Sequence, residues 1–345
     1  MRLRTSLGIA IGTAFGTLIA AKALRSRRAI DLAGRTVAIF GGSRGLGLAM
    51  AREFSNAGAY VVLTARDEQE LERAAADIEQ QGGQVTTIAC DITDREQIER
   101  TVGRIVHDRG GIDVLVNNAG IIQVGPLEHM TIDDFEEAMA THFWGPLYTI
   151  LAALPHMRGP RARRIVNISS IGGKIAVPHL LPYTASKFAL TGLSEGLRAE
   201  LAGQGFAVTT VCPGLMRTGS TYNAMFKGQH RHEFAWFHLS NAIPGVSVSA
   251  SRAARRIVDA CRHGDAEVIL TPTARLAVLA NGISPSTTAR LLQLANHLMP
   301  APSAGQGIRS HSGWQSVSRY VPSAVTRLTD RATIENNELP DASTS

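Results

Sequence analysis

Three side chains that could exchange a proton fall within one stretch of the sequence. Ser170 follows a short apolar run at residues 165–168, and Tyr183 and Lys187 lie in a later segment with helical periodicity. A short run rich in β-branched residues that leads into glycines predicts a buried strand. Residues i and i+4 of a helix share one face. The sequence therefore predicts a serine at a strand end that faces a tyrosine and a lysine on the next helix.

The chemistry open to this trio is proton exchange with a carbonyl or alcohol oxygen. An isolated phenol has a pKa of about 10, and an adjacent ammonium favours the phenolate and lowers that pKa. Tyr183 and Lys187 could then serve as an acid–base pair near neutral pH, with the Ser170 hydroxyl hydrogen-bonded to the same oxygen. Such a reaction also needs a hydride donor. An ordinary helix-surface pair of tyrosine and lysine is the alternative that the spacing leaves open.

A glycine-rich turn earlier in the chain indicates where a nucleotide would bind. The apolar run at residues 36–40 is followed by Gly41-Gly42-Ser43-Arg44-Gly45-Leu46-Gly47 and then by a helix-like segment. Glycines let a backbone turn tightly against a pyrophosphate, which the N-terminus of the following helix attracts. A plain tight turn remains the alternative when this pattern is taken by itself.

Together these motifs resemble the short-chain dehydrogenase/reductase family over residues 35–271. The alternation of strands and helices predicts an α/β fold with a doubly wound, Rossmann-type parallel sheet, and the resemblance implies seven strands. The resemblance also implies a catalytic trio of Ser170, Tyr183 and Lys187. The cofactor-binding residues that it implies are Gly41, Ser43, Arg44, Gly45, Leu46, Gly47, Arg66, Asp91, Ile92, Asn118, Ala119, Gly120, Tyr183, Lys187, Pro213, Gly214 and Thr218.

Two positions depart from the family pattern. Phe40 precedes the glycine turn where the family usually has threonine, and His142 stands where the catalytic group of the family has asparagine. The family asparagine helps to hold a water that links the lysine to solvent. Histidine can also donate and accept a hydrogen bond, so we predict a relay role for His142. A packed histidine with no catalytic role is the alternative.

The positions that follow the second strand indicate which cofactor is preferred. Relatives that prefer NAD place an acid there to bind the ribose 2′-hydroxyl, whereas this chain has Ala65-Arg66, with Arg44 inside the glycine turn. Two guanidinium groups suit a 2′-phosphate because each can grip it with paired hydrogen bonds. Asp67 lies one place too late and is better interpreted as the start of the next helix. The sequence therefore predicts NADP(H).

An aromatic-rich segment at residues 219–248 lies where the family places its substrate lid. It contains, among others, Tyr222, Phe234, Trp236 and Phe237. Aromatic side chains gathered in one insert predict a lipophilic alcohol, aldehyde or ketone of steroid-, retinoid- or long-chain type as the substrate. Plain packing of the lid on the core is the alternative.

The N-terminal residues 1–30 predict a membrane anchor. No charged side chain occurs between Thr5 and Ala21, and Lys22 can extend the apolar stretch to Leu24. This length is close to the lower limit of about 17 residues for a bilayer-spanning helix. The basic residues at 22–28 predict that the following domain faces the cytoplasm. A cleaved signal peptide, a soluble packed helix and a misassigned start remain as alternatives.

The remainder of the chain is predicted to contain one catalytic domain and two extensions. The domain covers residues 31–271, and residues 272–300 form an apolar helical extension that Pro285 divides into two helices. A homodimer contact and a surface lying on a membrane are both open for this extension. Residues 301–345 are rich in serine, proline and glycine, which predicts an irregular or partly disordered arm with one short helix at residues 325–334.

Charge and cysteine content narrow the classes of function. The net charge of +6 does not indicate a nucleic-acid partner, because the arginines are scattered and no aromatic stacking surface accompanies them. The 3 cysteines have neither metal-ligand nor disulfide spacing, which suits a reducing compartment. The sequence thus predicts an oxidoreductase that interconverts a carbonyl and an alcohol. A catalytically idle NADP-binding scaffold or redox sensor is the alternative.

Overall fold

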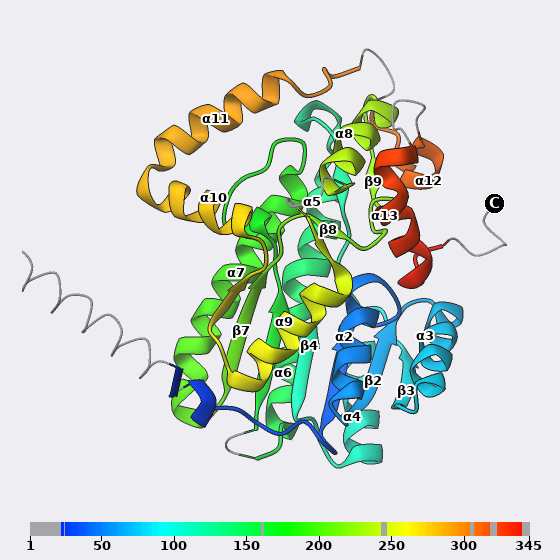
Figure 1. The fold of residues 1–345 in the computed structure, drawn as a ribbon, viewed down its shortest axis with the longest axis vertical. Helices are drawn as coiled ribbons and strands as arrows, with labels where there is room; N and C mark the ends of the chain where they lie inside the picture. Colours follow the sequence, from blue (N-terminus) through cyan, green and yellow to red (C-terminus); the bar gives the residue numbers. More distant parts are fainter. Residues whose placement is uncertain are drawn as a thin grey trace, which may run out of the picture.

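The computed structural model describes residues 22–23, 25–159, 162–242, 247–303, 307–317 and 323–339. A parallel sheet of seven strands, in the order β11-β7-β6-β4-β1-β2-β3, runs through its centre (Figure 1). This confirms the predicted fold class. The strands are β1 (Thr36–Phe40), β2 (Tyr60–Ala65), β3 (Gln84–Ala89), β4 (Val114–Asn117), β6 (Arg164–Ile168), β7 (Ala207–Cys212) and β11 (Glu267–Ile269).

The central strands are buried along their whole length, as helices on both faces of a parallel sheet require. Every residue of β1, β4 and β6 is buried. The registers place Val37 opposite both Val61 of β2 and Val114 of β4. Such continuous apolar runs carry no period-2 pattern, and they formed the signal for strands in the sequence.

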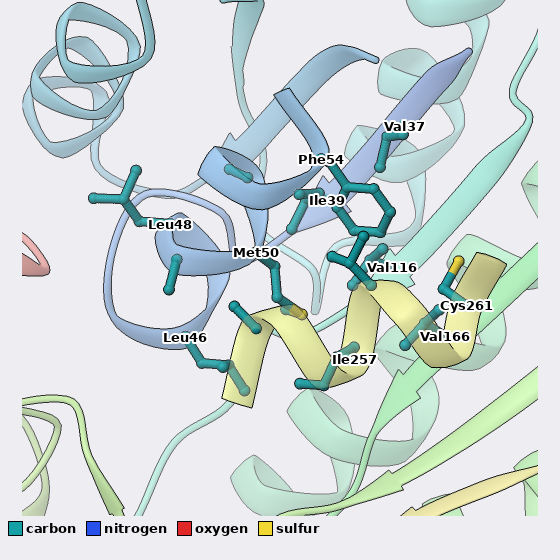
Figure 2. Close-up of a cluster of buried hydrophobic side chains, with 14 of the residues drawn as sticks. Val37, Ile39, Leu46, Leu48, Met50, Phe54, Val116, Val166, Ile257 and Cys261 are labelled. Atoms are coloured by element: carbon teal, nitrogen blue, oxygen red, sulfur yellow. The ribbon is translucent and has the colours of Figure 1, made fainter. Parts of the chain in front are cut away.

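Two layers of helices cover the sheet. One face packs against α2 (Gly45–Asn56), α3 (Glu68–Gln80) and α9 (Ala250–His263), and the other against α4 (Arg95–Arg109), α6 (Gly145–Ala153) and α7 (Leu181–Leu201). Figure 2 shows the first interface, where Phe54 and Met50 of α2 and Ile257 of α9 pack with β-strand side chains such as Ile39. Each fully buried side chain of this size contributes about 1.5–3 kcal/mol to stability, so this layer holds the glycine turn firmly.

The helical segment at residues 132–156 is interrupted in the structure. It consists of α5 (Ile132–Met139), a π-helical turn η2 (Ala140–Trp144), α6 and a short 3-10 turn η3 (Leu154–His156). A π-turn inside an α-helix is rare and is often found at functional sites. This turn contains His142, so it sets the direction of that side chain.

Two small sheets form the roof over the strand ends. One pairs β5 (Gln123–Val124), β9 (Met225–Phe226) and β12 (His311–Ser312), and the other pairs β8 (Met216–Arg217) with β10 (Val248–Ser249). Helix α8 (His230–Ala242) packs onto this roof. Short 3-10 turns complete the connections at η1 (Leu127–His129), η4 (Ile171–Gly173) and η5 (Ala202–Gln204).

The C-terminal region returns to the domain after a helical excursion. Helices α10 (Pro272–Ile283) and α11 (Pro285–His297) are divided at Pro285, as the sequence predicts, and α11 lies away from the sheet and has no buried residue (Figure 1). The arm that follows is more regular than expected, since it contains α12 (Gly313–Ser316) and α13 (Ser323–Glu335). Helix α13 contains the predicted short helix and packs against α8 and β8.

Most of the predicted N-terminal anchor lies outside the described residues, because only residues 22–23 of the segment 5–24 are described. Among the helices in the described part of the chain, none combines the length and the apolar character that crossing a membrane requires.

Candidate active site

A cavity of about 1070 Å³ lies at the carboxyl ends of the central strands. Its walls are formed by the segments that follow β1, β2, β3, β4, β6 and β7 and by the roof above them. This is where an open α/β sheet binds its ligand, since β1 and β4 diverge in topology there. Every predicted site residue lines the cavity except Gly47, which lies in the first turn of α2.

The glycine turn has a shape that only glycine permits at two positions. Gly41 has a φ of +84°, and a Cβ there would lie 2.5 Å from the backbone of Ala119. A Cβ on Gly47 would lie 1.9 Å from the carbonyl oxygen of Gly41. Asn118 Nδ2 donates to that same carbonyl at 2.6 Å. The turn is thus pressed against the segment after β4, and it places the N-terminus of α2 at the cavity, where a helix terminus can attract a phosphate group.

The predicted catalytic trio meets at one wall of the cavity. Ser170 is the residue before η4, two positions after the end of β6, and its Oγ accepts a hydrogen bond from Gly172 N at 3.0 Å. Tyr183 and Lys187 lie on α7, with Lys187 Nζ 5.6 Å from the centre of the tyrosine ring. Lys187 Nζ donates to the Ile168 carbonyl at 2.9 Å. The strand end and the helix therefore bring the three groups together as the sequence predicts.

Burial shifts the pKa values of Tyr183 and Lys187. It raises the pKa of the Tyr183 phenol, while a hydrogen bond from the Ser170 side chain acts in the opposite direction. Burial also lowers the pKa of Lys187 to about 7. We expected Lys187 to lower the pKa of Tyr183, but this arrangement does not show that effect. The reason is that the ammonium is turned toward the Ile168 carbonyl and both charged forms are desolvated.

His142 is fully buried and held at both ring nitrogens. Its Nε2 accepts from Ile121 N at 3.1 Å, so its Nδ1 carries the proton and donates to Ser186 Oγ at 2.8 Å. Burial and the charge of Lys187 lower the pKa of His142 well below its ordinary value. The ring also meets Tyr183 edge to face, with centroids 5.3 Å apart. The geometry connects His142 firmly to α7, and the relay role stays a prediction.

The two arginines predicted for the cofactor differ in their surroundings. Arg44 directly precedes α2, and its Nη1 lies 2.8 Å from Glu70 Oε1, while Ser43 Oγ donates to Glu70 Oε2 at 2.8 Å. Arg66 is exposed at the rim of the cavity. Glu70 was not identified from the sequence, because its approach to the turn depends on how α3 packs.

Two groups of predicted cofactor-binding residues, Asp91 after β3 and the segment of Pro213 and Thr218 after β7, lie in different parts of the cavity wall. Asp91 accepts hydrogen bonds from Thr93 N and Thr93 Oγ1, which fixes the loop after β3. The carbonyl of Pro213 accepts from Ile171 N at 2.7 Å and joins the loop after β7 to the segment that carries Ser170. Thr218 Oγ1 donates to Ser220 Oγ at 2.8 Å.

Some aromatic side chains of the lid segment pack in the roof, and others line the cavity. Phe226, Phe234 and Phe237 are buried in a small core of the roof, which agrees with the packing alternative. Trp236 and Phe237 nevertheless line the cavity. Two polar features of the same wall were not identified from the sequence. Lys227 Nζ donates to Asp134 Oδ2 at 2.6 Å, and Glu338 reaches the glycine turn from the C-terminal arm.

Comparisons with known proteins agree with this geometry. The chain matches the family model described as short chain dehydrogenase over residues 35–226. It is 35% identical to a dehydrogenase/reductase SDR family protein 7-like of Anopheles gambiae, an alignment that covers 75% of this chain and 82% of the relative. It is also 35% identical to a gluconate 5-dehydrogenase of Gluconobacter oxydans over 55% of this chain and 75% of the relative.

Solved structures show the same fold. A dehydrogenase/reductase from Sinorhizobium meliloti superposes with a TM-score of 0.62 at 31% identity and covers 73% of this chain and 99% of its own. A short-chain dehydrogenase/reductase from Burkholderia phymatum, solved in complex with NAD, has a TM-score of 0.67 at 21% identity and covers 75% and 96% of the two chains. The sheet, the glycine turn and these similarities together place the chain in the short-chain dehydrogenase family of nicotinamide-dependent oxidoreductases.

Proposed function

We propose that the protein is an NADP(H)-dependent oxidoreductase that interconverts a carbonyl and an alcohol on a lipophilic substrate. The observation that carries this proposal is the meeting of Ser170, Tyr183 and Lys187 at one wall of the cavity that the glycine turn also lines. When bound, the cofactor supplies or accepts the hydride. Tyr183 donates the proton to the carbonyl oxygen in reduction and removes it from the alcohol in oxidation, and Ser170 orients that oxygen.

The side chains on the roof side of the cavity suit a substrate that has an apolar body and one polar group. Leu180, Trp236 and Phe237 line the cavity on one side, and the ion pair of Lys227 with Asp134 lines it elsewhere. Purified protein should oxidise NADPH in the presence of long-chain or polycyclic ketones and aldehydes, and small polar sugars should be poor substrates. Turnover of sugars alone would contradict the lipophilic assignment, and no turnover with bound NADPH would favour the idle scaffold.

Cofactor preference is expected to depend on Arg44 and Arg66. In the NADP complex their guanidinium groups would hold the 2′-phosphate, with hydrogen bonds to a charged group contributing about 1.5–3 kcal/mol each. Replacing both with alanine should therefore raise KM for NADPH by about tenfold or more and reverse the preference toward NADH. Arg95→Ala is a suitable control because this exposed side chain pairs with Glu99 on α4. Equal kcat/KM for NADH and NADPH in the parent protein would contradict the proposal.

We further propose that the protein associates with membranes and that its catalytic domain faces the cytoplasm. Support comes from the uncharged segment between Thr5 and Ala21 and from the apolar side chains exposed on α10 and α11. Those on the two helices are Leu276, Leu279, Ile283, Leu291 and Leu294, and Leu298 follows α11 directly. No acidic residue occurs between positions 272 and 299, so this region would not be repelled by anionic lipid.

Cell fractionation tests the membrane assignment. Full-length protein should stay with membranes through a high-salt wash, and a version that starts at Ala29 should be released or bind weakly. The high-salt wash separates apolar insertion from charge attraction, because salt screens the latter. If full-length protein remains in the supernatant as a dimer, the exposed face of α10 and α11 is better explained as a subunit contact.

A further inference from the structure

The last described residues of the chain lie directly on the glycine turn. Gly45 N, at the first turn of α2, donates to the carbonyl of Asn336 at 2.8 Å. Asn337 Nδ2 donates to the carbonyls of Ser43 and Glu70 at 3.0 and 3.1 Å. Residues 333–339, here called the C-terminal strap, therefore hydrogen-bond to backbone groups of the turn and of α3 at the cavity wall.

Glu338 carries its carboxylate to the N-terminus of α2. Its side chain is only 3% exposed, and Oε2 accepts from Asn223 Nδ2 at 2.6 Å. A Cβ on Gly45 would lie 2.5 Å from Glu338 Oε1. Arg44 Nε is 3.8 Å from the same carboxylate. A carboxyl group thus already lies at the helix terminus, in the position where a glycine turn of this type holds a phosphate.

Contacts to two separate parts of the domain hold the strap and the helix that leads into it, α13. Tyr222 OH, in the roof, donates to Asp330 Oδ1 of α13 at 2.7 Å. Arg52 Nη2 of α2 donates to the carbonyl of Glu335 at 2.8 Å. Helix α13, drawn in red in Figure 1, lies above the start of α2 and beside the roof. The strap is therefore part of the folded domain, and its position against the turn is specific.

We propose that the C-terminal strap is an internal competitor of the cofactor, so that NADP(H) must displace Glu338 from the N-terminus of α2. This inference rests on the cofactor assigned in the proposed function. Two anions cannot share one buried helix terminus without strong repulsion. Displacement would also release Arg44 from Glu338 and leave its guanidinium available to the 2′-phosphate.

The raised pKa of Glu338 is consistent with a contact that a bound phosphate could replace. Burial raises the pKa of this carboxyl to about 7, and Glu70 adds to this rise, while Arg44 and the hydrogen bond from Asn223 oppose it. Near neutral pH, keeping this buried carboxyl group ionised therefore costs free energy. A phosphate group carries more charge and can use the same helix terminus.

Direct binding of NADPH to the full-length chain tests the proposal. Glu338→Gln keeps the shape of the side chain and removes its charge, so we expect the Kd for NADPH to fall. If the strap is docked about nine-tenths of the time, about one-tenth of the protein is free to bind NADPH. A substitution that releases the strap then lowers the apparent Kd by about tenfold. Glu335→Gln is the matched control, since this carboxylate is 53% exposed and pairs with Arg331 on α13 instead of facing the turn, and it should leave the Kd unchanged.

Hydrogen exchange gives a second readout on the same proteins. Adding NADPH to the parent protein should increase the exchange of residues 333–339. Weaker binding by Glu338→Gln would identify Glu338 as a cofactor ligand and overturn the competition. An unchanged Kd together with unchanged exchange would also overturn it and leave the proposed function intact. A failure of all three proteins to bind NADPH would instead overturn the proposed cofactor, and with it the role of the strap.

Discussion

Replacing Tyr183 with phenylalanine is expected to lower kcat by about 10²–10⁴, because positioned proton transfer contributes that range. The substitution removes the phenolic oxygen and its proton and keeps the ring that packs edge to face on His142. The Kd for NADPH should change little, since the ring and the Lys187 contact to Ile168 remain. Steady-state rates with the best ketone of the substrate panel, together with direct NADPH binding, check both expectations.

Tyr148→Phe provides the matched control for that experiment. Tyr148 lies on α6, where its ring stacks with Trp144, and it is not among the residues that line the cavity. The same chemical change should therefore leave kcat near its parental value. A Tyr183→Phe variant with near-normal turnover would remove Tyr183 from the mechanism and reopen the assignment of the proton donor.

The same assay distinguishes the two interpretations of His142. If His142 takes part in a proton relay, His142→Ala should lower kcat and shift its pH profile, and His142→Asn should restore both. If the ring only joins Ile121 to Ser186, the alanine variant should lose stability without a changed pH profile. Parental kinetics in both variants would show that the relay prediction is wrong.

Substituting alanine for Gly47 is expected to disrupt the cofactor cradle. The new Cβ would lie 1.9 Å from the Gly41 carbonyl oxygen and 2.7 Å from Asn118 Nδ2, and a backbone atom cannot move aside without shifting the turn. Overpacking of this kind costs about 1–3 kcal/mol of folding stability. Because the shifted atoms belong to the cavity wall, we expect NADPH affinity to fall by about 100-fold, equivalent to about 3 kcal/mol. Thermal unfolding and NADPH titration measure the two effects.

Gly103→Ala is the control for this substitution. Gly103 lies in the exposed face of α4, and a Cβ there would meet nothing within 4 Å. An alanine in a helix interior is more favourable than glycine by about 1 kcal/mol. This control should raise the midpoint of unfolding and leave NADPH affinity unchanged. Tight NADPH binding by Gly47→Ala would show that the turn does not hold the cofactor.

The positions that local sequence determines were predicted well. Short apolar runs identified β1 and β6, because a strand buried on both faces has no alternation to obscure it. The spacing of Tyr183 and Lys187 placed them on one helix face, and the glycines marked the turn, because these are relations between residues close in the chain. The fold and the trio thus followed from local patterns and the family resemblance that they support.

Tertiary packing alone decided the rest of the site. The sequence contains no sign that Glu70 would approach Arg44, that Lys227 would pair with Asp134, or that Glu338 would reach Gly45. The pKa of Tyr183 also went against expectation, because burial and the direction of the Lys187 side chain outweighed spacing along the helix. Such contacts join residues far apart in the chain, and their energy depends on burial and geometry that only the folded chain defines.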